Sequence, residues 1–187
     1  MFLSWSVLRV TSAAPVDRWT VPQLIPSAMH LVVAVLFLNR DRWTRQGDFA
    51  SILWSLPSFV VGGLTINLAQ SPHQWPWTAQ LLFTLGAVGA VTGLLFLGPS
   101  FAIFPSIRRI VNNGPFQYIR HPIYLAELVM IAACCVACSN TLIWLLFLMG
   151  IFAIVIRISF EEKILRQSAE YLSYCSLVRF RLIPGIW

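Results

Sequence analysis

The chain has 187 residues, of which 58% are hydrophobic and only 11% are charged, and its mean hydropathy is +0.75. This composition excludes an ordinary soluble domain and is typical of a chain that crosses a membrane several times. The net charge of +6 does not indicate nucleic-acid binding, because the basic residues concentrate in loops beside apolar segments and no nucleic-acid motif is present.

Five apolar segments predict about five membrane-spanning helices, and therefore an all-α, multi-pass integral membrane bundle. In chain order they cover residues 21–38, 50–70, 79–97, 121–138 and 141–156. The third contains Gly89 and Gly93, a small-xxx-small pattern that favours close packing of helices. Beyond residue 156 the helical pattern becomes amphipathic, which predicts a further helix near the end of the chain. The first residues carry no basic stretch ahead of apolar ones, so we expect no cleaved signal peptide.

The distribution of Lys and Arg predicts the orientation of these helices. Of the 13 basic residues, three lie in the loop after the first span, three in the loop after the third and five in the tail. The other side holds only Arg9 and Arg18. Because cytoplasmic loops are enriched in Lys and Arg, we expect the long loop and the C-terminal helix in the cytoplasm. A four-span alternative, with the first apolar stretch at the interface, keeps the same cytoplasmic loops.

Three of the four cysteines, at 134, 135 and 138, lie in one apolar segment. No histidine or carboxylate joins them at a spacing that metal ligands use. We therefore expect buried thiols that pack as small hydrophobic groups, with no metal site and no disulfide framework.

A first group of polar residues lies at the start of the fourth span. His121 and Tyr124 are three residues apart and share a helix face, which Glu127 continues one turn further. Ionisable groups at this depth are costly, so they indicate a functional site. The alternative for Glu127 is a polar contact to a neighbouring helix, and Pro122 suits the first turn of a helix.

A second group, Arg157, Glu161 and Glu162, follows the fifth span. The connection between the two spans is so short that they must fold back on each other, which brings both groups to one membrane face. Carboxylate, imidazole, phenol and guanidinium groups together suit a zwitterionic small molecule. The alternative for Arg157 and Glu161 is an ordinary pair on a helix surface.

The tail carries further candidates. Tyr171 and Tyr174 are three residues apart on the predicted amphipathic helix, where packing against the bundle or against lipid headgroups is the simpler explanation. Arg179 and Arg181 suit contacts to lipid phosphate groups as well as contacts to a substrate.

Four motifs in order resemble the isoprenylcysteine carboxyl methyltransferase superfamily, which includes phospholipid methyltransferases. They are Gly-Pro-Phe-Gln-Tyr-Ile-Arg-His-Pro-Ile-Tyr at 114–124, Glu-Glu at 161–162, Glu-Tyr-Leu-Ser-Tyr at 170–174 and Arg-Leu-Ile-Pro-Gly-Ile-Trp at 181–187. The resemblance covers residues 100–187. It implies an integral membrane enzyme that transfers a methyl group from S-adenosylmethionine to a lipophilic or lipidated acceptor, with membrane lipids as neighbours and no nucleic acid.

The resemblance also implies a single membrane domain over residues 1–187. In it, the helices of residues 1–98 support a catalytic part, residues 99–187, which consists of the cofactor-binding helical hairpin and the tail. The implied cofactor pocket comprises Arg120, His121, Pro122, Tyr124, Glu161 and Glu162, and the expected catalytic residues are Arg157 and Arg179. Two positions depart from the family pattern: Ala126 replaces a usual glycine, which narrows the expected approach of the cofactor, and Leu177 replaces a frequent arginine, for which Arg179 is the candidate substitute.

Two other functions stay open at this point. The pattern His121-Pro122-x-Tyr124-x-x-Glu127 also resembles the cofactor segment of sterol and steroid reductases, which use NADPH, although Glu161-Glu162 favours the methyltransferase. A non-catalytic membrane subunit would have no affinity for either cofactor. For the enzyme, we expect a bacterial inner membrane location with the active site on the cytoplasmic side.

Overall fold

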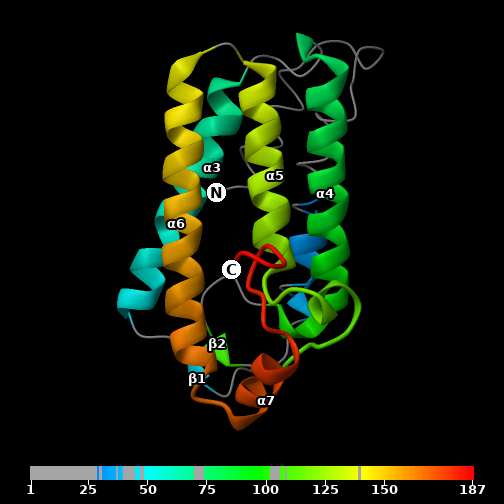
Figure 1. Ribbon diagram of the computed structural model, residues 1–187, viewed down its shortest axis with the longest axis vertical. Coiled ribbons are helices and arrows are strands. Elements are labelled where there is room, and N and C mark those ends of the chain that lie inside the picture. The colour runs from blue at the N-terminus through cyan, green and yellow to red at the C-terminus, as the bar shows by residue number, and fades with distance from the viewer. Residues whose placement is uncertain are drawn as a thin grey trace.

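The computed structural model describes residues 29, 31–36, 38–39, 45–46, 49–69, 74–101, 106–107, 109–138 and 140–187. Within these ranges four long helices stand side by side along the long axis of the molecule (Figure 1). They are α3 (Phe49–Leu68), α4 (Trp77–Leu97), α5 (Pro122–Ala137) and α6 (Thr141–Leu165). The predicted all-α character is confirmed, since the described strands are only two residues each.

Smaller elements gather near one end of the bundle. They are β1 (Arg45–Gln46), η3 (Gly98–Ser100), β2 (Ser106–Ile107), η4 (Gly114–Gln117) and α7 (Ala169–Leu177). The two strands pair antiparallel, with Arg45 opposite Ile107. Figure 1 shows β1, β2 and α7 at the lower end of the view, where α5 begins and α6 ends. This end holds the polar residues of the hairpin.

Among the helices that the structure describes, two are long and apolar enough to cross a membrane, α4 with its following turn (Trp77–Ser100) and α6. The described apolar parts of the other two are shorter, Leu53–Leu68 in α3 and Pro122–Ala137 in α5. The predicted first span, 21–38, falls largely outside the described residues, so the number five stays a prediction. Several apolar residues on α4 and α6 are more than half exposed, and such apolar surface suits contact with lipid; they include Leu85, Leu95, Leu148 and Phe152.

The ends of the hairpin helices follow from local sequence. Pro122 opens α5, at a position where its missing N–H has no helical partner to lose. Asn140 caps α6, because its side-chain oxygen accepts a hydrogen bond from the backbone N–H of Leu142 at 2.9 Å. α6 continues to Leu165, past the predicted end near 156. The predicted single amphipathic helix is therefore divided between the end of α6 and the separate α7, with a turn at 166–168.

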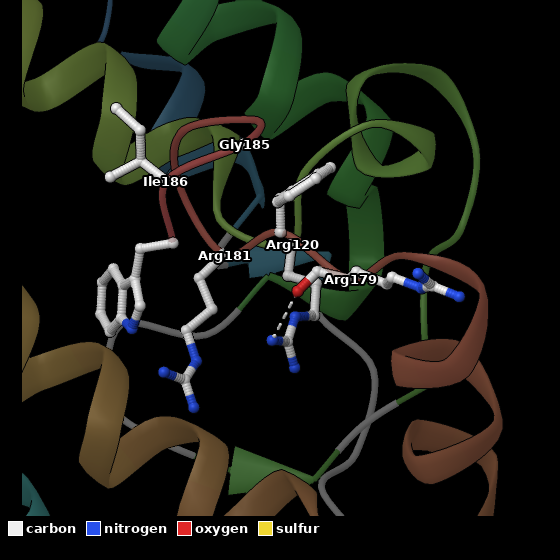
Figure 2. Close-up of a pocket in the computed structure, with 7 residues that line it drawn as sticks. Arg120, Arg179, Arg181, Gly185 and Ile186 are labelled. Carbon is white, nitrogen blue, oxygen red and sulfur yellow. Dashed lines mark hydrogen bonds between the residues drawn. The ribbon is translucent and has the colours of Figure 1, made fainter.

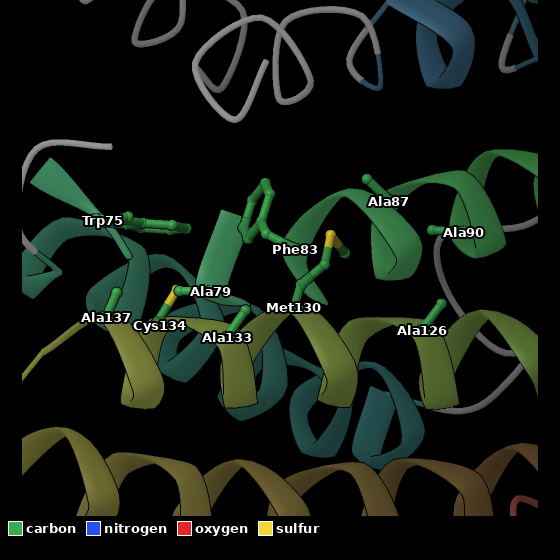
Figure 3. Close-up of a cluster of buried hydrophobic side chains, with 10 residues drawn as sticks. All are labelled: Trp75, Ala79, Phe83, Ala87, Ala90, Ala126, Met130, Ala133, Cys134 and Ala137. Atoms are coloured by element: carbon green, nitrogen blue, oxygen red, sulfur yellow. The ribbon is translucent and has the colours of Figure 1, made fainter. Parts of the chain in front are cut away.

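α4 and α5 pack closely because small residues line their contact (Figure 3). A Cβ at Gly93 would lie 2.7 Å from Ile123 Cγ1, and one at Gly86 would lie 2.8 Å from Met130 Cγ. Ala126 belongs to this contact and is 6% exposed. The expectation that Ala126 narrows the approach of a cofactor is therefore wrong, because its methyl group packs on α4.

The four cysteines are free, and Cys134 and Cys135 are fully buried in the bundle. The prediction of buried thiols is confirmed for these two. Cys138 and Cys175 are only partly buried.

Candidate functional site

The antiparallel hairpin of α5 and α6 brings the two predicted polar groups together. His121 Nε2 lies 3.3 Å from Glu162 Oε1, and the Tyr124 hydroxyl donates a hydrogen bond to Glu161 Oε2. The predicted meeting of imidazole, phenol and carboxylate groups at one end of the hairpin is confirmed. Pro122, which lies between His121 and Tyr124 in the sequence, is buried.

Glu162 is the centre of the site. Its side chain is buried, and its two oxygens contact Arg120 Nη1 at 3.0 Å, Arg181 Nε at 3.0 Å and Arg166 Nη2 at 3.3 Å, in addition to His121. A buried carboxylate is stable only when cations and hydrogen bonds compensate its lost hydration. These contacts therefore hold the start of α5, the end of α6 and the tail around one charge.

Tyr124 and His121 form a second layer of the site. Their rings stack with centroids 5.5 Å apart and planes within 17°. Glu161, which accepts from Tyr124, is less buried than its neighbour Glu162. The two adjacent carboxylates thus differ in role: one is enclosed by cations, and the other presents oxygen atoms beside a phenol.

Arg157 points into the bundle. It is 5% exposed, its Nη1 donates to Ser58 Oγ at 3.0 Å, and its guanidinium lies over the rings of Phe59 and Tyr124 at 4.1 and 4.9 Å. The alternative of a helix-surface pair with Glu161 is therefore wrong. The guanidinium links α3 to the hairpin and covers one face of the Tyr124 ring, whereas its catalytic role stays a prediction.

Glu127 also faces α3. A Cβ at Gly62 would lie 3.5 Å from Glu127 Oε1, so the carboxylate lies against the glycine surface of that helix. This position supports the polar contact between helices and places Glu127 away from the group around Glu162.

The tail returns to the hairpin after α7. Backbone N–H groups of Arg120 and His121 donate to the carbonyls of Phe180 and Arg181, both at 2.9 Å. Residues 180–187 then form a hook, in which the Trp187 oxygen accepts from the N–H groups of three hook residues, 181, 182 and 183. Figure 1 shows this hook between α5 and α6.

The hook fills the space between the hairpin helices beside the polar residues. Leu182 is 5% exposed and packs with Ile154 and Ile158 of α6, and Tyr124 and Trp187 border this cluster. The Arg181 guanidinium lies 4.8 Å from the centre of the Trp187 ring. The space between the polar ends of the hairpin, where a zwitterionic small molecule is expected, is thus partly closed by the tail.

A cavity of about 240 Å³ opens beside the hook (Figure 2). Its lining consists of one residue before α5 and six from the tail: Arg120, Arg179, Phe180, Arg181, Gly185, Ile186 and Trp187. Gly185 has a φ of +83°, a conformation that favours glycine and lets the hook turn back on itself.

The two tail arginines have different surroundings. The Arg179 guanidinium extends away from those of Arg120 and Arg181 (Figure 2), and only its backbone carbonyl joins the site, accepting from Arg120 Nη2 at 3.2 Å. Arg181 instead reaches Glu162, a partner that the sequence analysis, which expected lipid phosphate or a substrate there, did not predict. No local signal separates the two arginines, since the difference depends on how the hook folds. Leu177 is 75% exposed and takes no part.

Two tyrosines of α7 face the site from below, and their hydroxyl groups differ. Tyr174 donates to the Phe116 carbonyl at 2.6 Å, whereas Tyr171 Oη is buried without a hydrogen-bond partner among the described residues. Burial raises the pKa of both phenols, so both stay protonated at neutral pH. Arg120 Nε is a second buried donor without a partner in the described part of the chain.

Arg120 connects α7 to the centre of the site. Its Nη1 lies 2.9 Å from Cys175 Sγ as well as 3.0 Å from Glu162. Burial lowers the pKa of Arg120, but Glu162 and other neighbours more than compensate, and the pKa lies above its usual value. The guanidinium is therefore a permanent positive charge at the mouth of the hairpin.

Comparison with known proteins gives one result that bears on this site. The family model described as phospholipid methyltransferase matches residues 77–168, just under half of the chain. The matched segment runs from α4 through α6 and includes every residue of the predicted cofactor pocket. α7 and the hook lie beyond it. No curated protein matches the chain.

Proposed function

We propose that the chain, whose residues 77–168 match the family model described as phospholipid methyltransferase, is an integral membrane methyltransferase that uses S-adenosylmethionine. The proposed acceptor is a lipophilic or lipidated molecule that reaches the site from the bilayer. The observation that carries the proposal is the convergence of Tyr124 on Glu161 and of His121 on Glu162 at one end of the family segment.

The donor and acceptor groups of the site fit such a cofactor. S-adenosylmethionine carries a carboxylate, an ammonium group and ribose hydroxyl groups. Glu161 presents oxygen atoms for hydroxyl or ammonium donors, and Arg120 has a buried Nε–H that lacks an acceptor among the residues described. Charge-assisted hydrogen bonds of this kind supply both affinity and orientation.

When bound, the cofactor would supply an electrophilic methyl group on its sulfonium sulfur. Transfer of that methyl group to a nucleophilic atom of the acceptor would break its bond to sulfur and leave S-adenosylhomocysteine. The task of the protein is to hold the two reactants in line and to exclude water. Arg157 would contribute by fixing the Tyr124 ring that it covers.

The tail hook would control entry. A cavity of about 240 Å³ is smaller than the roughly 300–1,000 Å³ of sites that enclose a drug-sized ligand. Admission of the whole cofactor therefore requires the hook to move away from the hairpin, with Gly185 as a natural point of flexion. Arg181 would then leave Glu162, which frees that carboxylate for a cationic group of the ligand.

The proposed location is a bacterial inner membrane with the site on its cytoplasmic side. This orientation rests on the sequence, which assigns eleven basic residues of the loops and tail to the predicted cytoplasmic side and two to the other. The proposed partners are membrane lipids and the lipophilic acceptor.

The test is ligand-induced thermal stabilisation of the purified full chain in detergent. We expect S-adenosylhomocysteine to raise the Tm of the wild type, and expect Glu161→Gln and His121→Ala to abolish most of that rise. Lys163→Gln is the matched control, because it changes an exposed charge next to the site on α6. A rise that survives both site substitutions would place the pocket elsewhere.

NADPH and an empty buffer complete the experiment. Stabilisation by NADPH with no response to S-adenosylhomocysteine would replace the methyltransferase by a reductase. No response to either ligand would favour a non-catalytic subunit.

A further inference from the structure

Tyr171 is a buried donor for which the described part of the chain supplies no acceptor. The residue is 3% exposed, and its hydroxyl has no hydrogen-bond partner among the described residues. Buried hydroxyl groups are nearly always paired, because leaving one unpaired costs the hydration it has lost. Arg120 Nε is in the same position.

These two donors belong to one neighbourhood. Arg120 Nη1 contacts Cys175 Sγ at 2.9 Å, and Cys175 lies one helical turn after Tyr171 on the same face of α7. Arg120 in turn binds Glu162 at 3.0 Å, and the pKa of the Tyr171 phenol is raised first by burial and then by the negative charge of Glu162. The phenol of Tyr171 therefore faces the site from the tail side.

We propose that Tyr171 is a ligand-binding residue, whose hydroxyl donates together with Arg120 Nε to the carboxylate of the cofactor's amino-acid group. The inference rests on the proposed function. A carboxylate is the matching partner because it only accepts, and each of the two groups has a hydrogen to donate at neutral pH, the Nε–H of Arg120 and the phenol O–H of Tyr171. The remaining guanidinium nitrogens of Arg120 are already engaged with Cys175, Glu162 and the Arg179 carbonyl.

Tyr174 provides a matched control on the same helix. Its ring centroid lies 5.8 Å from that of Tyr171, it is equally buried, and its hydroxyl already donates to Phe116 O at 2.6 Å. Removing this hydroxyl leaves a buried carbonyl unpaired, whereas removing the hydroxyl of Tyr171 breaks no hydrogen bond to any residue that the structure describes.

The experiment compares Tyr171→Phe with Tyr174→Phe in the full chain, by thermal unfolding without ligand and by calorimetric titration with S-adenosylhomocysteine. We expect Tyr171→Phe to keep or raise the Tm of the ligand-free protein and to weaken binding about tenfold. Tyr174→Phe should lower the Tm and leave the Kd within about twofold of the wild type.

A second ligand tests the carboxylate directly. The decarboxylated analogue of S-adenosylhomocysteine should bind the wild type more weakly, and Tyr171→Phe should not weaken it further, because the partner of the hydroxyl is absent. Equal weakening for both ligands would overturn the carboxylate assignment.

Two results would overturn the inference while the proposed function stands. In the first, the wild type binds S-adenosylhomocysteine no more tightly than Tyr171→Phe does. In the second, Tyr171→Phe without ligand is as unstable as Tyr174→Phe. The second result would mean that a buried water or another internal acceptor pairs with the hydroxyl. If the wild type does not bind S-adenosylhomocysteine at all, the proposed function fails and the inference fails with it.

Discussion

Replacing Glu162 by glutamine should destabilise the protein more than any other single change of charge in the hairpin. The substitution keeps the shape of the side chain but leaves Arg120 and Arg181 beside a neutral group, with the Arg120 side chain only 7% exposed. Removing one partner of a buried ion pair costs about 3–5 kcal/mol. For a chain of this length that corresponds to a Tm lower by about 6–20 °C, measured by circular dichroism in detergent.

Arg166→Gln is the control for this prediction. Arg166 contacts the same carboxylate at 3.3 Å, but its side chain is 47% exposed, and such surface pairs contribute at most about 1 kcal/mol. Its Tm should therefore fall by no more than about 4 °C. A Glu162→Gln variant whose Tm falls no further than that of Arg166→Gln would refute the assignment of Glu162 as the centre of the site.

Three further predictions use the same unfolding assay. Arg181→Gln should cost about 1–2 kcal/mol because it loses a charged hydrogen bond at 3.0 Å, while Arg179→Gln should be nearly neutral; equal effects would contradict the structure of the hook. Gly93→Ala should cost about 1–3 kcal/mol because its Cβ would clash with α5, whereas Gly63→Ala meets open space and should be neutral or stabilising by up to about 1 kcal/mol. Asn140→Ala should cost about 1 kcal/mol through loss of the cap of α6, and an unchanged Tm would contradict that cap.

The hairpin could be predicted from sequence because two strong signals agree there. A long apolar run on each side of a very short connection forces antiparallel helices, and polar residues at the far ends of both runs must then meet. This reasoning predicts that His121 meets a carboxylate of α6, but it does not predict that the carboxylate is Glu162 and not Glu161. Adjacent residues point about 100° apart on a helix, so the choice depends on how α6 is rotated against α5.

The parts that sequence could not give depend on tertiary packing. Arg157 follows an apolar run, and the sequence predicts it at the end of a membrane span. In the structure it is buried, because its guanidinium contacts Ser58 and two aromatic rings on other helices. The position of Arg181 depends on the hook, which is held by backbone hydrogen bonds that any sequence could make. The sequence does not distinguish Tyr171 from Tyr174. Only the folded structure shows that the Tyr174 hydroxyl has a partner and that the Tyr171 hydroxyl has none among the described residues.

Photochemical crosslinking of S-adenosylmethionine labelled in its methyl group tests the central claim most directly. The purified chain is irradiated with the labelled cofactor, digested, and the labelled peptides are identified by mass spectrometry. We expect label on peptides that contain residues 114–124 or 157–187, and expect excess S-adenosylhomocysteine to remove it. Label confined to α3 or α4, or label that S-adenosylhomocysteine does not displace, would contradict a cofactor site at the joined ends of α5 and α6.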